Sequence, residues 1–335
     1  MKDIYILAIE SSCDETSMAI IKNGHECVAL TILTQMDTHA LYGGVVPEIA
    51  SRMHVENITM VLDETLKKAN MKIDQVNAVA VTYAPGLVGS LLVGVECAKT
   101  IAFLYNLPLI KVNHIAGHIY ANNIDNTIVF PTLALVVSGG HTDLVIIKGD
   151  YDFEVLGSTL DDAVGECFDK VARVLDLKYP GGPNVQKLAS LGKETYKLNE
   201  PMKDNSYNFS FSGLKSNVIN LVNTAKMKNE IINKADLASS FQNVAIKSLI
   251  KKVELAINNF TEIKHLLLAG GVSANELLRC EMKNLANKYN LKLSVPDIKL
   301  CTDNAAMIGA AAYPLYKRKE FSNFDFDVES RTELF

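Results

Sequence analysis

The chain has 335 residues, of which 48% are apolar and 21% charged, so it can bury the cores of two domains or lobes. Its mean hydropathy is +0.12, no run of ~18 apolar residues has basic flanks, and the first residues reach charge too early for a signal peptide. The six cysteines are widely spaced without a Cys-x-x-Cys pair, which indicates neither a zinc knuckle nor a disulfide framework. We therefore expect a cytoplasmic protein without a membrane segment.

Charge is unevenly distributed along the chain, whose net charge is −5. Residues 1–150 contain 9 Lys and Arg against 15 Asp and Glu, whereas residues 151–335 contain 24 against 23. Because an acidic surface repels nucleic acid, contact with RNA would depend on local lysine patches in the second half or on a partner.

The first predicted elements form a strand-turn-strand unit over residues 4–21, in which two apolar strands flank a polar turn. A loop marked by Gly43-Gly44 then leads into a helix expected over 47–69. A strand over 76–81 leads through a tight turn into a helix over 91–105. This alternation of strands and helices indicates an α/β fold.

Two histidines four residues apart follow the next predicted strand. Asn113 is a good N-cap residue, and a helix that begins there places His114 and His118 on one face, one turn apart. Two such imidazoles can share a metal ion, or can be half-buried side chains with backbone partners. Ile115 stands where His-Glu-x-x-His zinc proteases carry their general-base glutamate, so the pair lacks that base.

Residues 133–147 repeat the strand-turn-strand plan of residues 4–21, which predicts a duplicated lobe. In this second unit Gly139-Gly140 can bring backbone N–H groups close to a phosphate, or can be the turn of an ordinary hairpin. The presence of two similar hairpins in one chain favours the phosphate interpretation.

The rest of the chain is predicted to be mainly helical. We expect a capped helix that begins at Ser158, a turn over 179–183 that exposes backbone, and a surface excursion over 190–209. Asp303 is expected to cap a small, apolar last helix that is suited to packing between two lobes. The other helices are expected over 213–225 and 235–260, and the other strands over 265–268 and 292–295.

Several motifs occur together in an order that is hard to match by chance. They are His114-x-x-x-His118, Ser138-Gly139-Gly140-His141, Ala269-Gly270-Gly271-Val272-Ser273-Ala274-Asn275 and Cys301-Thr302-Asp303-Asn304, with further stretches over 10–16, 43–48, 179–183 and 208–215. From about Ile6 to about Tyr313 the chain closely resembles the bacterial tRNA N(6)-adenosine threonylcarbamoyltransferase family, formerly called the glycoprotease or O-sialoglycoprotein endopeptidase family.

This resemblance implies an α/β fold of the two-lobed actin-like, sugar-kinase and heat-shock ATPase superfamily, with duplicated lobes and the site in the interlobe cleft. The expected N-terminal lobe is formed by residues 1–112 plus 304–327. Residues 113–303 are expected to form the C-terminal lobe, and residues 328–335 a tail.

The resemblance also implies a metal site, because family members bind one metal through two histidines and an aspartate. These match His114, His118 and Asp303. Imidazole and carboxylate ligands suit several divalent ions, of which Fe²⁺ is favoured here and Zn²⁺ is the alternative.

A nucleotide site is implied as well, which would hold the adenylate donor or ATP in the cleft. The expected contacts are Val136, Val137, Ser138, Gly139, Gly140, Asp169, Gly182 and Asn275, with His141 and Gln186 as supporting residues. Gln186 stands where many relatives have an aspartate. An uncharged amide can still bond ribose hydroxyls, but it cannot replace a carboxylate.

The implied reaction transfers a threonylcarbamoyl group from threonylcarbamoyl-adenylate to the exocyclic amine of adenosine 37 in tRNAs that read codons starting with A. Because this mixed anhydride is already activated, the protein must add positioning, charge stabilisation and removal of the amine proton. The metal is the expected Lewis acid, and Asp14 or Glu15 the expected proton acceptor, although either carboxylate could serve only the turn.

The partners implied are tRNA, a degenerate paralogue subunit, a small ATPase subunit, and a separate synthase that supplies the donor. Two other functions stay open. The chain could be a superfamily ATPase with a regulatory or scaffold role, in which the turns hold ATP and the metal is structural. It could also be a metalloendopeptidase, although Ile115 counts against that function.

Overall fold

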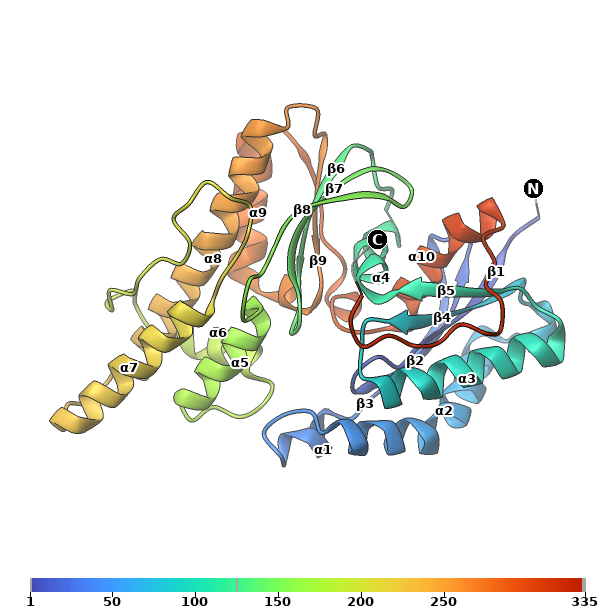
Figure 1. Ribbon diagram of the computed structural model, residues 1–335, viewed down its shortest axis with the longest axis horizontal. Helices are drawn as coiled ribbons and strands as arrows, with labels where there is room; N and C mark the ends of the chain where they lie inside the picture. The colour runs from blue at the N-terminus through green and yellow to red at the C-terminus, as the bar shows by residue number, and fades with distance from the viewer. Residues whose placement is uncertain (1, 125, 333–335) are drawn as a thin grey trace. The chain divides into compact units, whose positions relative to one another are not determined.

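The computed structural model describes residues 2–124 and 126–332. The chain divides into two compact units, Met1–Ile128 with Pro296–Phe335, and Val129–Val295, each built on a five-stranded mixed sheet (Figure 1). These boundaries differ from the expected lobe boundaries after residues 112 and 303. The physical reason is that the short helix carrying the histidine pair packs against the last helix, within the first unit.

The sheet of the first unit has the strand order β3-β2-β1-β4-β5. Its strands are β1 (Tyr5–Glu10), β2 (Glu15–Lys22), β3 (Glu26–Thr34), β4 (Ala78–Ala84) and β5 (Leu109–Asn113). Helices α2 (Pro47–Ala69) and α3 (Val88–Tyr105) cover one face, and α4 (His114–Tyr120) and α10 (Ala305–Arg318) the other (Figure 1). The short elements are α1 (Met36–Ala40), η1 (Ile73–Gln75), η2 (Ala121–Asn123) and η4 (Ile298–Leu300).

The sheet of the second unit has the order β8-β7-β6-β9-β10, which repeats the first. In both units three strands form an antiparallel meander, and the first strand of the meander pairs in parallel with the next strand of the sheet. The duplication predicted from the two hairpins is therefore confirmed. The strands are β6 (Thr132–Val137), β7 (Thr142–Gly149), β8 (Asp152–Ser158), β9 (His265–Ala269) and β10 (Lys292–Ser294). The helices are α5 (Val164–Val174), α6 (Gly181–Ala189), α7 (Ser212–Lys228), α8 (Lys234–Asn259), η3 (Gly271–Ala274) and α9 (Glu276–Lys288).

Helix α5 begins six residues later than predicted, because the residues before it have other partners. Ser158 ends β8. Asp161 accepts hydrogen bonds from the backbone N–H groups at the start of α7, and Asp162 forms ion pairs with Lys170 and Lys215. The two carboxylates therefore fix α7 against α5 and do not cap α5.

The prediction that Asp303 caps the last helix is wrong. The N-cap of α10 is Asn304, whose side-chain oxygen accepts a hydrogen bond from Met307 N at 3.1 Å. Both residues are common N-cap types, so the sequence alone does not separate them. The Asp303 carboxylate faces α4 instead, and α10 packs against α4, β1 and β2 of the first unit.

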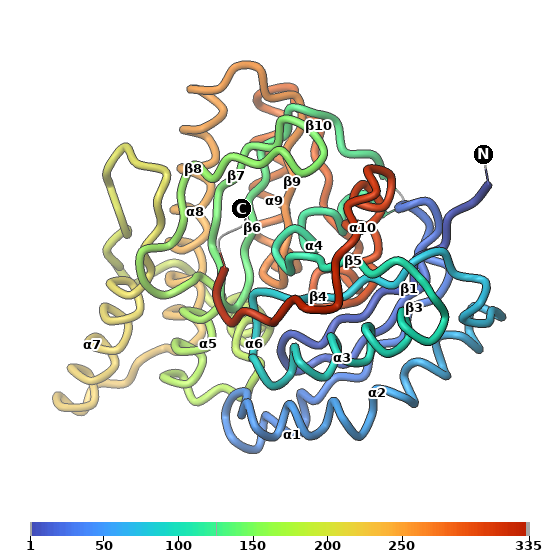
Figure 2. The backbone as a smooth tube through the Cα atoms, turned by 45° about the vertical axis from the view of Figure 1, so that its right-hand side comes forward, coloured from blue at the N-terminus to red at the C-terminus, as the bar shows by residue number. Residues whose placement is uncertain are grey.

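The C-terminal segment returns along the first unit beside α3 and β5 (Figure 2). Ser322 N donates a hydrogen bond to Leu109 O at 2.7 Å, and Phe326 and Val328 pack against the core of this unit. The segment thus covers the edge strand β5, which would otherwise offer unpaired backbone groups. The predicted tail starts within this packed segment, and its residues 333–335 lie outside the described part of the chain.

Among residues 2–124 and 126–332, α3 is the one helix long and apolar enough to cross a membrane by length and composition. Its residues Leu91, Val95 and Ala98 are fully buried, and the helix packs against β4 and α2. These contacts are those of a helix in a domain core.

The stability of the second unit is expected to fall in mild acid because of His265. This side chain is fully buried in β9, where Nδ1 accepts from Val129 N at 3.1 Å and Nε2 lies 2.9 Å from Ser294 Oγ. Burial, with the charge of Lys292, lowers the pKa of His265 to about 4. Because the unfolded value is about 6.5, stability is present above that pH and is lost as pH falls toward 4. Urea unfolding should show about 1 to 2 kcal/mol lost between pH 7 and pH 5, and His265→Gln should lose correspondingly less.

Candidate functional site

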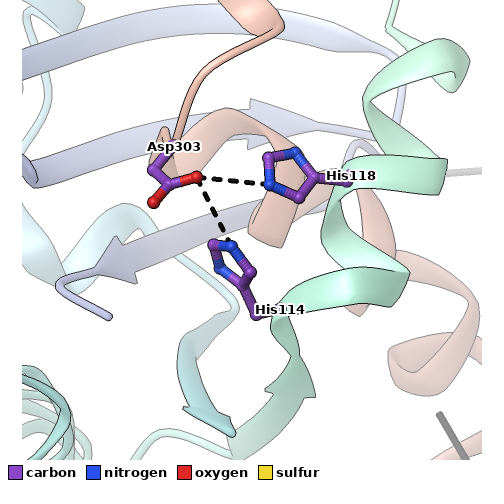
Figure 3. Close-up of side chains that lie close together, drawn as sticks. All are labelled: His114, His118 and Asp303. Carbon is purple, nitrogen blue, oxygen red and sulfur yellow. Dashed lines mark ion pairs between the residues drawn. The ribbon is translucent and has the colours of Figure 1, made fainter. Parts of the chain in front are cut away.

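The histidine pair lies on α4, as predicted. The side chain of Asn113 caps this helix by accepting hydrogen bonds from Ile115 N at 2.8 Å and from the next backbone N–H. His114 and His118 therefore project from one face, and the centroids of their rings lie 4.6 Å apart. Asp303 Oδ1 lies 3.4 Å from His114 Nε2 and 3.2 Å from His118 Nε2, so the three side chains converge (Figure 3).

This group has the geometry of a site for one metal ion. Its ligand atoms lie within 4.8 Å of one another, and ligands with bonds of about 2.1 Å to one ion lie about 3 to 4 Å apart. His118 is 1% exposed, yet in the described structure neither of its ring nitrogens makes a hydrogen bond. A buried imidazole without such a bond is costly unless another partner binds its lone pair. The three residues fit a single metal ion.

Electrostatics within the group favour a bound cation. Burial opposes ionisation of Asp303, but the charge of His114 and the close approach of both imidazoles outweigh it and hold the pKa of that carboxyl well below its usual range. Burial also disfavours a charged His114, but Asp303 and Glu10 outweigh it and raise the pKa of His114 well above its ordinary value. Burial lowers the pKa of His118. A metal ion held by these residues would therefore compete with a proton on His114.

Glu10, which was not among the predicted site residues, contacts His114 at Nδ1, the ring nitrogen that faces away from Asp303. Its side chain is 0% exposed, and Oε2 lies 3.1 Å from His114 Nδ1. Thr82 Oγ1 donates to the same oxygen at 2.6 Å, and Ser12 N donates to Oε1 at 2.6 Å. An acceptor at Nδ1 requires a proton there and leaves the Nε2 lone pair for a metal. In the sequence Glu10 is only a charged residue that ends an apolar strand, so no local signal shows this role.

Glu10→Gln is expected to weaken metal binding by about 10- to 100-fold, because the amide loses the charge that orients and polarises His114. Calorimetric titration of the metal-free protein with Zn²⁺ would measure this loss. Glu26→Gln, at the exposed start of β3 in the same sheet, is the matched control and should leave the affinity unchanged. Equal affinities for all three proteins would exclude a role for Glu10 in holding the ligand.

Of the predicted proton acceptors, Asp14 lies on the turn between β1 and β2, and Glu15 is the first residue of β2. Asp14 is 7% exposed, and Glu15 accepts a hydrogen bond from Thr34 Oγ1 at 3.3 Å. Burial, followed by the negative charges of Asp303 and Asp14, raises the pKa of Glu15 well above its ordinary value. Glu15 is therefore electrostatically close to the metal ligands, and a carboxylate with a raised pKa is a better base near neutral pH.

The predicted nucleotide-binding residues all lie in the second unit, where close backbone contacts connect their segments. Gly270 has φ +86°, and a Cβ built on it would lie 2.4 Å from Val137 O. A Cβ on Gly165 would lie 2.4 Å from Ser138 O. The turn before α9 and the start of α5 therefore both press against the end of β6, at distances that only glycine allows.

The same segments are joined on their other side by side-chain caps. Asp169 of α5 accepts a hydrogen bond from Gly181 N at 2.7 Å, at the start of α6, and burial raises the pKa of this carboxyl. Gln186 of α6 accepts one from Glu276 N at 3.0 Å, and Asn275 caps α9. The contacts form a closed ring within this unit, from the Ser138 turn through α5, α6 and α9 back to β6.

The glycine turns of this ring are open. Built Cβ atoms on Gly139, Gly140 and Gly182 would meet nothing within 4 Å. His141 N donates to Ser138 Oγ at 3.1 Å, which closes the turn. The side chains of Val136 and Val137 are both fully buried, and that of Val137 belongs to the core of the unit. Backbone atoms and open glycines are therefore the groups with access to a ligand.

Comparison with known proteins identifies the family. A family model described as tRNA N6-adenosine threonylcarbamoyltransferase matches residues 26–310. The chain belongs to this family. Relatives of that name include proteins of Staphylococcus haemolyticus, 49% identical over 99% of this chain and 97% of their own, and Anoxybacillus flavithermus, 53% identical over 95% and 93%. The family implied by the sequence motifs is thus confirmed.

Solved structures show the fold. The HypF protein of T. kodakarensis is 14% identical with a TM-score of 0.64, over 95% of this chain and 49% of that chain. Component A of (R)-2-hydroxyglutaryl-CoA dehydratase from Acidaminococcus fermentans is 16% identical with a TM-score of 0.54, over 93% and 98%. At these identities the likeness concerns the fold alone, which is the actin-like ATPase and sugar-kinase type expected for this threonylcarbamoyltransferase family.

Proposed function

We propose that this chain, a transferase by its family, moves the threonylcarbamoyl group from threonylcarbamoyl-adenylate to the exocyclic amine of adenosine 37 in tRNAs that read codons starting with A. The observation that carries the proposal is the convergence of His114, His118 and Asp303, in a chain of this family, beside a carboxylate with a raised pKa. The activity is an acyl transfer that releases AMP.

The reaction needs little activation of the donor. The amine nitrogen attacks the carbamoyl carbon, the bond from that carbon to the phosphate oxygen breaks, and AMP leaves with the oxygen. A divalent ion bound by His114, His118 and Asp303, for which we favour Fe²⁺ over Zn²⁺, would supply Lewis acidity toward the donor. Glu15 accepts the proton lost by the amine, and Asp14 raises the basicity of Glu15 through its charge.

The adenylate part of the donor is assigned to the ring of segments in the second unit. Backbone N–H groups of Gly139 and Gly140 hold the phosphate, since the open glycines allow close approach, whereas Ser138 N already donates to His141 O. The amide oxygen of Gln186 is occupied by Glu276 N, so its Nε2 is left to donate to a ribose hydroxyl. A carboxylate at this position could not donate.

Transfer to tRNA is proposed to need helper subunits. The net charge of −5 disfavours tight binding of a polyanion by this chain alone. We propose that a degenerate paralogue and a small ATPase subunit assist tRNA binding and turnover, that a separate synthase supplies the donor, and that the reaction takes place in the cytoplasm.

The test is incubation of the chain with labelled threonylcarbamoyl-adenylate and tRNA, with candidate partner subunits, before and after chelation. Modified adenosine that depends on the metal, in equal amounts to AMP, is the expected result. Phosphate release from ATP without any modified adenosine would indicate a regulatory ATPase. Cleavage of peptides would indicate an endopeptidase.

A further inference from the structure

A chain of buried polar side chains crosses the first unit beside the proposed catalytic turn. His39 of α1, Gln35 before α1, and His54 of α2 are 0%, 2% and 0% exposed. His39 Nε2 lies 3.1 Å from Gln35 Oε1, and Gln35 Nε2 donates to Ala50 O at 3.2 Å and lies 3.5 Å from His54 Nδ1. We call these three residues the His39–Gln35–His54 relay. None of them is among the proposed metal, nucleotide or proton-transfer residues.

The hydrogen-bond partners fix the direction of the relay. Val46 N donates to His39 Nδ1 at 3.3 Å, so the proton of His39 is on Nε2 and points to Gln35. His54 Nε2 lies 3.0 Å from Cys13 O, an acceptor, so the proton of His54 is on Nε2 and its Nδ1 accepts. Both imidazoles therefore donate through Nε2. The single lone pair of His54 Nδ1 faces Thr16 Oγ1 at 2.7 Å, and Gln35 Nε2 reaches the same atom as a weaker second contact at 3.5 Å.

One end of the relay holds the turn that carries the carboxylates. His54 bonds Cys13 O through Nε2, and its Nδ1 lies 2.7 Å from Thr16 Oγ1. The backbone N–H of Gln35 donates to Asp14 O at 3.0 Å. Three bonds thus fix the segment 13–16 on both sides of Glu15.

The other end holds the loop between α1 and α2. Besides the bond from Val46, the N–H groups of Tyr42 and Gly44 donate to His39 O at 3.0 and 3.2 Å. The tip of this loop is exposed, with Leu41 84% and Tyr42 61% accessible. A loop with an apolar tip and a glycine pair is held in one place mainly by its anchors.

We propose that the His39–Gln35–His54 relay is a positioning device that joins the loop 41–46 and the turn 13–16 into one rigid body and so sets the place of Glu15 for proton transfer. The inference rests on the proposed function for the role of Glu15, but the mechanical joining of the two segments does not. Removal of the central amide leaves the buried Nε2–H of His39 without its acceptor and removes the tie from Gln35 to Ala50 O of α2, so both ends are expected to loosen although their own bonds remain.

The test is Gln35→Met, which keeps the side-chain length and removes the central hydrogen bonds. Thr65→Val, in the same helix as His54 and equally buried, is the matched control. In Gln35→Met, hydrogen–deuterium exchange should become faster in both the peptide that covers residues 11–18 and the peptide that covers residues 40–48. In Thr65→Val, exchange in both peptides should stay at the wild-type rate. With partners and saturating substrates, kcat should fall about 10- to 100-fold while KM and the affinity for Zn²⁺ stay unchanged.

Faster exchange in the loop peptide alone would overturn the proposal, as would an unchanged kcat when both peptides exchange faster. If wild-type protein shows no transfer at all, the proposed function fails, and the exchange experiment still decides whether the two segments are joined. Should Gln35→Met not fold, His39→Asn serves instead. Its side-chain oxygen can still accept from Val46 N, but the link to Gln35 is cut, so the same paired acceleration is expected.

Discussion

Asp303→Asn is expected to abolish metal binding at micromolar concentrations and to reduce threonylcarbamoyl transfer by roughly 10³-fold. The substitution keeps the shape of the side chain but removes its charge. His114 and His118 both face Asp303 Oδ1, so this one oxygen is shared by the whole group. Two imidazoles with a neutral amide make a much weaker site for a divalent ion than two imidazoles with a carboxylate. Calorimetric titration with Zn²⁺, and with Fe²⁺ without oxygen, measures the first effect.

Asp297→Asn is the control for this substitution, because Asp297 lies six residues earlier in the same connecting segment, is exposed and only caps η4. It should bind metal and transfer the group as the wild type does. An Asp303→Asn protein that still binds one ion with wild-type affinity would show that the three residues are not the metal site. Retained transfer after complete loss of metal would show that the ion has no part in the chemistry.

The duplicated architecture could be predicted from the sequence because its signal is local. Apolar strands on both sides of a polar turn occur over residues 4–21 and again over 133–147, and each became the central hairpin of a sheet. Strands β3 and β8 were not predicted. Both lie at sheet edges and are only partly buried. β8 has few apolar residues to distinguish it from a loop, whereas β3 (Glu26–Thr34) is mostly apolar, so its strand signal was present in the sequence.

The site was predictable to a smaller extent. The spacing of His114 and His118 places them on one face through helical geometry alone, and the structure agrees. Asp303 is nearly two hundred residues away, so only the family resemblance indicated that it joins them. The roles of Glu10 and Gln35 depend on burial of a polar side chain against partners that are distant in sequence, and no local pattern carries that information.

Glu15→Gln is expected to reduce kcat by about 10²- to 10⁴-fold, the usual contribution of a general base, and to leave metal binding unchanged. Asp14→Asn should cost less, because in our proposal Asp14 acts on Glu15 through its charge and does not take the proton itself. Rates of AMP release with saturating tRNA, together with Zn²⁺ titrations, separate these effects. A larger loss for Asp14→Asn than for Glu15→Gln would exchange the two roles.

The pH dependence distinguishes the roles further, since the base works only when ionised. Without a metal ion, the pKa of Glu15 is raised by burial and by the charges of Asp303 and Asp14. A cation on Asp303 offsets the second of these causes and leaves burial and Asp14, so the wild-type rate should fall as pH drops through the pKa of Glu15. Asp14→Asn removes one negative neighbour and lowers that pKa, so the acidic limb of its kcat profile should move to lower pH. Glu15→Gln should lose the limb altogether. If Asp14→Asn leaves the limb where it is, the two carboxylates are not coupled in the working enzyme, and the proton is taken elsewhere.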